Sequence, residues 1–487
     1  MTLDDQICYR AVAARDARFD GIFFVGVTTT GIYCRPLCTA RTPGRDRCRF
    51  FPHAALAEQA GFRPCLRCRP ELAPGHAPID AVGRTARHAE ARIQAGALND
   101  GGSLEQLAGE LGVSARQLRR GIRQEFGVSP VQLAQTNRLL LAKQLLTESR
   151  LPIIDVALAS GFSSVRRFNA LFREHYGFTP TTMRRSHREA PGPGALRLTL
   201  AYRPPFAWSR LLSFLAARAV PGVECVKNDA YLRTAALGTA RGWVRVAANP
   251  GRNALAVDLS TSLMPVLPEL LARLRHLFDL SARPDVIESH LAGDAQLVRS
   301  IRHIPGLRVP GAFNGFELAI RAILGQRVSV AAASTVAGRL AHAFGEAVAT
   351  PYPCLNRLAP DAERLEQLER PDFTRLGIPA SRGRAIRELA RAVLQRAVCL
   401  EPGVDPHRTI GQLVALPGVG DWTAQYIAMR ALRWPDAFPA GDLGLLRALR
   451  TNSPATLRKT AEAWRPWRAY AAMHLWNMAS LNQGSKS

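Results

Sequence analysis

The chain has 487 residues, of which 47% are hydrophobic, so it can form several packed domains and is not a fibrous or disordered protein. Its 64 basic residues outnumber 39 acidic ones, and the formal net charge of +25 favours a polyanionic partner such as nucleic acid. No apolar run reaches the length of a membrane span, and the acidic start MTLDDQICYR lacks a signal-peptide pattern. We therefore expect a cytoplasmic monomer that contacts no membrane.

Residues 1–76 hold six of the nine cysteines. Four of them form two close pairs, Cys34 with Cys38 and Cys65 with Cys68. Two close pairs separated by a longer loop suit four thiolates around one tetrahedral Zn²⁺, and disulfides are disfavoured because they are rare inside cells. The spacing therefore predicts a four-cysteine zinc domain. A zinc site that only stabilises the domain is the alternative to a reactive one.

The segments TTGIYCRPLCTAR and AGFRPCLRCRPE, which contain these pairs, resemble the N-terminal domain of the Ada family of bacterial adaptive-response proteins. The resemblance implies repair of methylphosphotriesters in DNA by methyl transfer to Cys34, which zinc keeps as a thiolate. Four thiolates and one Zn²⁺ sum to a formal charge of −2, and methylation leaves −1, so repair raises the affinity for DNA. The resemblance also assigns DNA contacts to Thr30, Arg41 and Arg63.

Residues 83–188 read as all-α and contain a repeat, with copies at 107–130 and 156–180. In each copy a helix and a glycine turn precede a basic helix, which is the helix-turn-helix layout. The two copies resemble the DNA-binding module of AraC-type regulators, with 131–147 as the linking helix. This predicts operator DNA as a partner and, for an activator, RNA polymerase. A solvated basic face is the alternative for the predicted reading residues, which are Arg116, Gln117, Arg120, Arg166 and Arg167.

Segments rich in proline and glycine at 73–78 and 189–196 mark linkers on either side of this helical region. After the second linker the pattern changes to that of a small α/β unit. It predicts a strand at 196–208, a helix at 209–219 and a β-hairpin at 242–260. Physical reasoning assigns this unit only a packing role.

The pattern from 291 onward is helical again, and its most informative stretch is 416–446. That stretch reads as a helix, a tight turn containing Gly418 and Gly420, a second helix, and a third helix that begins at Asp442. A glycine turn before a helix presents unpaired N–H groups, which suit a DNA phosphate. The simpler alternatives are an ordinary helix–helix turn and an ordinary N-cap.

The combination resembles the helix-hairpin-helix glycosylases of DNA base repair, in which a hairpin grips the DNA backbone and a downstream Asp faces the flipped nucleotide. Segments such as RPPFAWSRLLSFLAARAVPGVE and RPWRAYAAMHLWN resemble the AlkA family of 3-methyladenine DNA glycosylases. This resemblance covers residues 196–480. Gln326 then lies beside the DNA wedge, and Arg327 occupies the wedge position. The resemblance implies a base pocket lined by Trp422, Tyr426 and Trp476.

The expected substrates, 3-methyladenine and 7-methylguanine in DNA, carry cationic bases that are good leaving groups. Aromatic faces can hold such a base, and the Asp442 carboxylate can stabilise the sugar cation or activate water. No lysine lies within 416–446 to form a Schiff base, and no cysteine follows Cys399. This predicts a monofunctional, hydrolytic glycosylase without an iron–sulfur cluster.

The sequence thus predicts a multidomain fold that is mainly α with α+β parts. The leading hypothesis is a bifunctional adaptive-response protein that senses and repairs methylphosphotriesters, activates transcription and excises alkylated bases. One alternative is a DNA-binding regulator with an inactive glycosylase domain, and another is a glycosylase with a purely structural zinc domain. The predicted domains are the zinc domain at 1–76, the double helix-turn-helix at 83–188, the α/β domain at 196–290 and the helix-hairpin-helix domain at 291–487.

Overall fold

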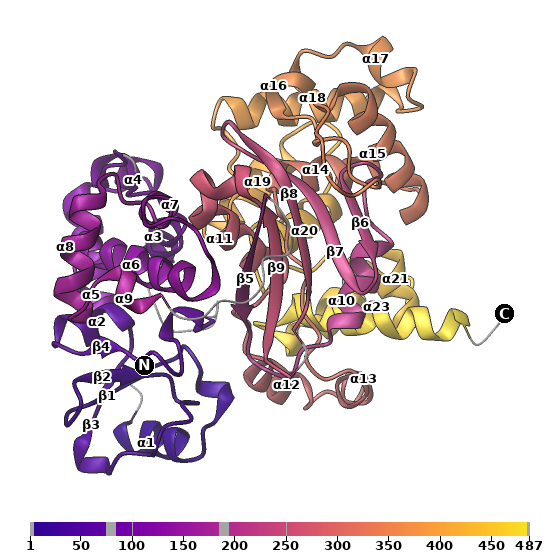
Figure 1. The fold of residues 1–487 in the computed structure, drawn as a ribbon. Helices are drawn as coiled ribbons and strands as arrows, with labels where there is room; N and C mark the ends of the chain where they lie inside the picture. The colour runs from indigo at the N-terminus through magenta and orange to yellow at the C-terminus, as the bar shows by residue number, and fades with distance from the viewer. Residues whose placement is uncertain (1–3, 75–83, 100, 185–193, 250, 485–487) are drawn as a thin grey trace. The chain divides into compact units, whose positions relative to one another are not determined.

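Figure 1 shows the computed structural model of the chain, which describes residues 4–74, 84–99, 101–184, 194–249 and 251–484. Residues 75–78 and 189–193 of the two predicted linkers lie outside the described residues. The chain divides into two compact units, which we describe separately. The first comprises residues 1–204, 237–240 and 248–275, and the second comprises residues 205–236, 241–247 and 276–487.

The first unit begins with a four-stranded sheet in the order β3-β1-β2-β4, accompanied by α1 (Asp5–Ala13) and α2 (Ala54–Gln59). Gly26 in β1 is required by packing, because an added Cβ would lie 2.8 Å from the Phe51 ring. Antiparallel pairs join β1 to β2 and β3, whereas β4 runs parallel to β2. The strands are β1 (Phe24–Val27), β2 (Ile32–Cys34), β3 (Cys48–Phe51) and β4 (Arg63–Pro64).

The helical part of the first unit confirms the predicted repeat. Ser114 and Ser164 cap the two basic helices, and Gly127 and Gly177 end them with φ of 73° and 76°, so both copies use the same start and stop residues. The linking helix predicted at 131–147 is α6 (Pro130–Glu148). The other helices are α3 (Arg84–Gln94), α4 (Leu104–Glu110), α5 (Ala115–Phe126), α7 (Ile153–Ala159), α8 (Val165–Tyr176) and α9 (Pro180–Met183).

Two further strands of the first unit, β5 (Ala195–Ala201) and β9 (Ala254–Ser260), pair antiparallel along their full length. The strand predicted at 196–208 was wrong beyond Ala201. Pro204 and Pro205 follow, and proline lacks the N–H that a strand ladder needs. Helix α11 (Leu267–Leu277) follows β9 in the chain.

The second unit holds three strands side by side in the order β8-β7-β6 and the predicted helix near 209–219, which is α10 (Trp208–Ala216). Both strands of the predicted hairpin are present, as β8 and β9. A disulfide between Cys225 and Cys354, which the sequence analysis did not predict, links β6 to the loop after α15. The strands are β6 (Glu224–Lys227), β7 (Ala230–Leu237) and β8 (Ala240–Ala248).

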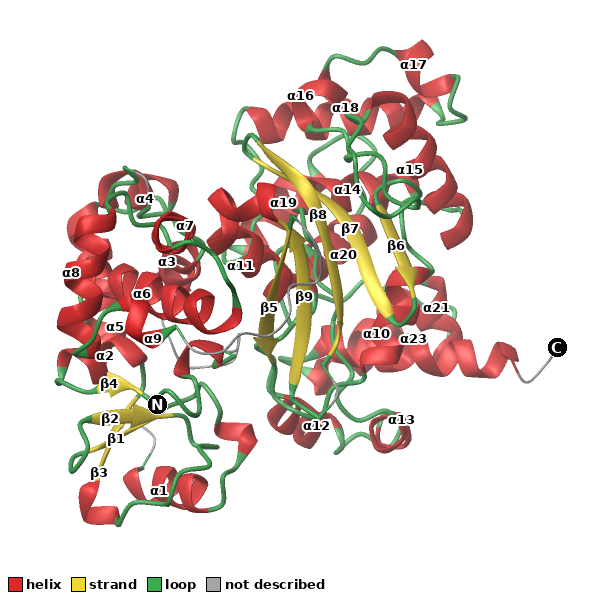
Figure 2. Ribbon diagram, viewed as in Figure 1, coloured by secondary structure: helices red, strands yellow, loops and turns green. Residues whose placement is uncertain are grey.

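The remainder of the second unit is helical, as Figure 2 shows. Helix α20 contributes Ala424 and Ile427 to one hydrophobic core and Ala428 and Met429 to another, which fixes the glycine turn before it and Asp442 after it. None of the described helices combines the length and apolar content that a membrane crossing requires. The helices are α12 (Pro284–Leu291), α13 (Val298–His303), α14 (Gly315–Leu324), α15 (Val330–Phe344), α16 (Ala362–Glu366), α17 (Arg370–Thr374), α18 (Ala380–Leu394), α19 (Pro406–Val414), α20 (Asp421–Arg430), α21 (Leu443–Ala448), α22 (Pro454–Ala461) and α23 (Arg468–Gly484).

Candidate functional site

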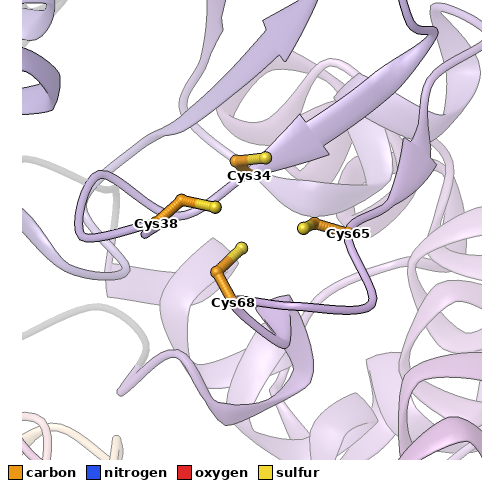
Figure 3. A group of neighbouring side chains, drawn as sticks. All are labelled: Cys34, Cys38, Cys65 and Cys68. Carbon is orange, nitrogen blue, oxygen red and sulfur yellow. The ribbon is translucent and has the colours of Figure 1, made fainter. Parts of the chain in front are cut away.

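Four cysteine side chains point toward one another in the first unit (Figure 3). Tyr33 of β2 lies opposite Pro64 of β4 in the parallel ladder, so the next residues, Cys34 and Cys65, are neighbours. Tight loops after these strands bring in the other two predicted ligands. All four Sγ atoms of Cys34, Cys38, Cys65 and Cys68 lie within 4.8 Å of one another.

This donor set fits Zn²⁺, which takes four thiolate ligands in a tetrahedron. Contacts with Cys38 and Cys65 raise the pKa of the Cys34 thiol, because neighbouring thiols cannot all ionise without a cation. A dication would remove that barrier and keep all four sulfurs as thiolates. Among the described residues, these four cysteines form the one group with the spacing of metal ligands.

The four sulfurs differ in their hydrogen bonds. Cys68 accepts a backbone N–H from Arg35 at 3.3 Å, and Cys65 accepts one from residue 67 at 3.3 Å. Cys38 accepts one from residue 40. No backbone N–H of the described residues donates to Cys34. A donated hydrogen bond withdraws electron density from a thiolate, so Cys34 differs from the other three sulfurs in lacking this effect.

A buried lysine fastens the second cysteine pair to the linking helix α6. Lys143 donates to the Cys65 carbonyl oxygen at 2.9 Å and forms an ion pair with Glu71, and neither side chain is more than 1% exposed. Arg69 extends the network from Glu71 to Glu148 of α6, each within 3.0 Å. Sequence reasoning missed Lys143. The available signal was a single lysine within an otherwise apolar stretch of α6.

The predicted DNA contacts of the first unit lie on its surface. Arg63 donates its backbone N–H to the Gly31 carbonyl at 2.8 Å, which places Thr30 and Arg63 at the same end of the sheet. Gln117 is also used locally, because its Oε1 accepts the backbone N–H of Ser114 at 3.0 Å to complete a helix cap. The exposed predicted residues are Thr30, Arg41, Arg63, Arg116, Gln117, Arg120, Arg166 and Arg167.

The glycine turn of the second unit joins α19 to α20. Gly418 has a φ of +82°, which favours glycine, and a Cβ at Gly420 would meet open space. Gln326 donates to the Gly418 carbonyl at 2.8 Å and to the Thr423 hydroxyl at 3.0 Å, so it fastens the loop after α14 to the turn. Gly420 and Asp421 are exposed at the start of α20, where the first N–H groups can meet an anion.

Asp442 accepts hydrogen bonds from four N–H groups. Its Oδ1 accepts from the backbone of Gly444 at 2.8 Å and Leu445 at 3.1 Å, and therefore caps α21 as predicted. The same oxygen accepts from the Trp476 indole at 2.8 Å, and Oδ2 accepts from the Trp422 indole at 3.1 Å. The same carboxylate therefore caps α21 and binds the two predicted pocket tryptophans. The four donors orient it and stabilise its negative charge.

The three predicted aromatic residues come together around Asp442. Trp422 and Tyr426 are stacked, with ring centroids 5.6 Å apart and an interplanar angle of 12°. Tyr426 lies 6.4 Å from Trp476 at 59°. Trp422, Asp442 and Trp476 are only partly buried, so solvent reaches them. We call these four residues, together with Phe214, the Asp442 site.

Phe214 and the arginines behind it were missed from the sequence. The Phe214 ring of α10 lies 6.4 Å from the Trp476 ring, and the Arg218 guanidinium lies 3.6 Å from the Phe214 centroid. Burial raises the pKa of Tyr426, but the charges of Arg430, Arg218 and a third arginine outweigh burial and lower it to about 8. The α/β region therefore contributes side chains to this site, contrary to the packing role that the sequence indicated.

The loop after α14 exposes both polar and apolar side chains. Arg327 is exposed and adopts a φ of +55°. Val328 and Val330 follow it with 41% and 40% of their surface exposed. Arg382 donates to the Gln326 carbonyl and holds the base of the loop. An apolar pair thus stands beside the arginine at the predicted wedge position.

Comparisons with known proteins divide the chain in the same way. Four family models match: "Metal binding domain of Ada" over residues 7–71, "Helix-turn-helix domain" over 107–186, "AlkA N-terminal domain" over 197–314 and "HhH-GPD superfamily base excision DNA repair protein" over 320–465.

This chain aligns with two relatives over most of the length of each. The chain is 41% identical over 484 residues to the "Probable bifunctional transcriptional activator/DNA repair enzyme AlkA" of Mycobacterium tuberculosis, covering 97% of this chain and 96% of the relative. It is 38% identical over 280 residues to "DNA-3-methyladenine glycosylase 2" of Escherichia coli, covering 57% of this chain and 96% of that protein. A 3-methyladenine DNA glycosylase from Archaeoglobus fulgidus shares the fold, with a TM-score of 0.50, 18% identity and coverage of 58% and 98%.

Proposed function

Because this chain belongs to the AlkA family of bifunctional transcriptional activator/DNA repair enzymes, we propose that its second unit hydrolyses the glycosidic bond of alkylated bases in DNA. The proposed substrates are 3-methyladenine and 7-methylguanine in duplex DNA. The observation that carries the proposal is Asp442, which four N–H donors hold beside the rings of Trp422, Tyr426 and Trp476.

The proposed reaction uses the positive charge of an N-alkylated purine. The damaged nucleotide leaves the stack at reduced cost because its pairing is weakened. The base then lies against the electron-rich rings, each contact contributing roughly 0.5–2 kcal/mol. The bond between the sugar carbon and the base nitrogen breaks, and its electron pair neutralises the departing base. The deoxyribose acquires positive charge.

Asp442 meets the charge that develops on the sugar. Its four donors fix the carboxylate before the substrate binds, so little reorganisation is needed during the reaction. This arrangement favours electrostatic stabilisation of the sugar cation. Water then attacks the sugar carbon and releases its proton to solvent. No lysine lies within residues 416–446, which supports a monofunctional hydrolytic enzyme and argues against a Schiff-base lyase.

We also propose that the first unit accepts methyl groups from methylphosphotriesters in DNA. Cys34, Cys38, Cys65 and Cys68 would hold one Zn²⁺, which supplies the positive charge that keeps the sulfurs ionised. The Cys34 sulfur attacks the methyl carbon, the carbon–oxygen bond breaks, and its electrons remain on the phosphate as a diester anion. The absence of a backbone donor to Cys34 supports this choice of nucleophile.

Methylation would remove one negative charge from the four-cysteine site and thereby strengthen DNA binding. The exposed arginines of α5 and α8 would read the operator, and RNA polymerase would be the partner in activation. We place these activities in the domains predicted at 1–76, 83–188, 196–290 and 291–487 of a cytoplasmic monomer.

The first experiment incubates methylated duplex DNA with the wild type and with Asp442→Asn, and identifies the released bases by chromatography. Release of 3-methyladenine and 7-methylguanine by the wild type alone supports both the enzyme and its carboxylate. Release by both proteins removes Asp442 from its role. Release by neither, from folded protein, favours a DNA-binding regulator whose glycosylase domain is inactive.

A second experiment tests Cys34 by mass spectrometry after incubation with DNA that carries methylphosphotriesters. We expect a single added methyl on Cys34 in the wild type and none in Cys34→Ser. Cys48→Ser is the matched control, because Cys48 is a buried cysteine outside the metal group. An unmodified Cys34 in zinc-loaded wild type would leave the zinc site with a structural role only.

A further inference from the structure

A small cavity lies within the first unit, and none of the four cysteines or the residues of the Asp442 site lines it. Its volume is about 90 Å³, and its lining comes from α6, from α11 and from the chain around the end of α3. Leu140 and Leu141 of α6 and Leu271 of α11 form apolar parts of the wall. A cavity of this size can hold a few water molecules or one small anion.

Arg275 of α11 brings an uncompensated positive charge to this cavity. The side chain lines the cavity, and its Nη1 atom is buried without a hydrogen-bond partner. Burial and the like charge of Arg35 lower the pKa of Arg275 to about 10, and no carboxylate within the described residues offsets them. A buried donor without an acceptor and a buried cation without an anion both cost free energy.

Arg138 of α6 adds a second positive charge to the lining. Its guanidinium donates to the Asn99 side-chain oxygen at 2.7 Å and to the Leu98 carbonyl, which are neutral acceptors. Asn137 lines the same cavity and carries an amide that can donate to an anion. The polar part of the wall therefore includes two guanidinium groups beside amide donors.

Glu71 is the one acidic residue of the cavity lining among the described residues, and its charge is already matched. It forms ion pairs with Lys143 and with Arg69, the second at 3.0 Å. Its carboxylate is not one of the charges that shift the pKa of Arg275. A positive charge therefore remains at Arg275, and a bound anion can neutralise it.

We propose that this cavity binds a small inorganic oxyanion, phosphate or sulfate, with Arg275 as its principal ligand. A planar guanidinium can donate two parallel hydrogen bonds to such an anion, and the bound anion supplies the acceptor that Nη1 lacks. Because α6 links the two helix-turn-helix units, an anion held between α6 and α11 stabilises the framework that carries both basic helices. This site is independent of the glycosylase function proposed above.

The first test uses the zinc-loaded, full-length protein and modifies its arginines with phenylglyoxal, followed by mass spectrometry of the peptides. Phosphate, sulfate or chloride is added at constant ionic strength. We expect phosphate and sulfate to slow the modification of Arg275 roughly tenfold when present at about ten times their dissociation constant. Arg273 of the same helix pairs with Glu269 and should show no saturable protection. Equal modification of Arg275 in all three salts overturns the proposal.

Two larger probes distinguish a free ion from a phosphate group carried by nucleic acid. A mononucleotide and a short DNA duplex are compared with inorganic phosphate in the same modification experiment. Because the cavity has room for a single small anion, we expect inorganic phosphate to protect Arg275 at the lowest phosphate-group concentration. Protection by the duplex but not by inorganic phosphate would assign Arg275 to DNA binding and overturn the proposal.

Arg275→Met gives a second measurement that does not depend on the reagent. Phosphate stabilises many folded proteins through exclusion from their surface, so the comparison is between proteins at equal phosphate concentration. The urea midpoint of the wild type should show an added, saturable rise that Arg275→Met lacks and that Arg273→Met keeps. Without phosphate, Arg275→Met should be at least as stable as the wild type, because an uncompensated buried charge has been removed. Equal phosphate responses of the wild type and Arg275→Met would refute the site.

Discussion

The four-cysteine site and the Asp442 site both concentrate negative charge, but they obtain it in different ways. The four thiols crowd within 4.8 Å, and this crowding raises the pKa of Cys34, so a dication is needed to ionise the set. Asp442 instead receives four N–H donors from the protein itself. The charge of the first site therefore depends on a metal, whereas the second site is held by donors of the fold itself.

The buried charges around the two sites also have different partners. Around the cysteines, buried charges are paired, as Lys143 is with Glu71 and Arg35 with Asp20. Around the second site, Arg218, Arg321 and Arg430 instead face the Tyr426 hydroxyl and lower its pKa to about 8. Paired charges hold the metal loops in place.

Removal of zinc should have the largest effect. Structural zinc contributes about 10–16 kcal/mol to folding, which is comparable to or larger than the stability of a typical domain. Treatment with a strong chelator should therefore unfold residues 5–72, with a loss of protection from hydrogen exchange and proteolysis. Base release should continue, because the Asp442 site uses no metal ligands. Protection of these strands without zinc would contradict the contrast between the two sites.

The next effect is expected from Lys143→Met. This change leaves Glu71 buried with only Arg69 as a partner, and breaking a buried pair costs about 3–5 kcal/mol. We expect the zinc domain to release its metal at a lower urea concentration, measured with a chromophoric chelator. Lys459→Met is the control, because that lysine is exposed and its loss should cost less than about 0.5 kcal/mol. Equal effects of the two changes would show that Lys143 does not stabilise the four-cysteine site.

The local parts of these sites were predictable from sequence, because neighbouring residues determine them. The cysteine spacing, the glycine turn with Gly418 and the cap at Asp442 are all short-range patterns, and the structure contains each one. The partners of these residues were not predictable. Lys143 reaches Cys65 across 78 positions of the chain, and the bond from Trp476 to Asp442 spans 34. Such contacts depend on how distant elements pack, which no local periodicity encodes.

Trp476→Phe tests whether the N–H donors to the Asp442 carboxylate are needed for base release. The substitution keeps an aromatic ring and removes the indole N–H that binds Oδ1 at 2.8 Å. A hydrogen bond to a charged group is worth about 1.5–3 kcal/mol, so the single-turnover rate of base release should fall roughly 10–100-fold. Trp434→Phe is the matched control, because that half-buried tryptophan packs on His407 and not on Asp442. An unchanged rate in Trp476→Phe would show that the donor is dispensable.

The smallest expected effect concerns Tyr426 and the pH dependence of stability. Its pKa in the folded protein is about 8, against an ordinary value of 10, because nearby arginines outweigh burial. A depressed pKa stabilises the fold when the group is ionised, so this contribution is absent below pH 8, grows between pH 8 and 10, and is complete above 10.

At pH 9 the contribution should be about 1.4 kcal/mol, the equivalent of one pKa unit. The free energy of unfolding of the second unit is measured in urea at pH 7 and pH 9 for the wild type and for Tyr426→Phe. The difference between the two proteins should grow by about that amount at the higher pH. If it stays constant, the arginines do not ionise Tyr426, and the charge of this site comes from Asp442 alone.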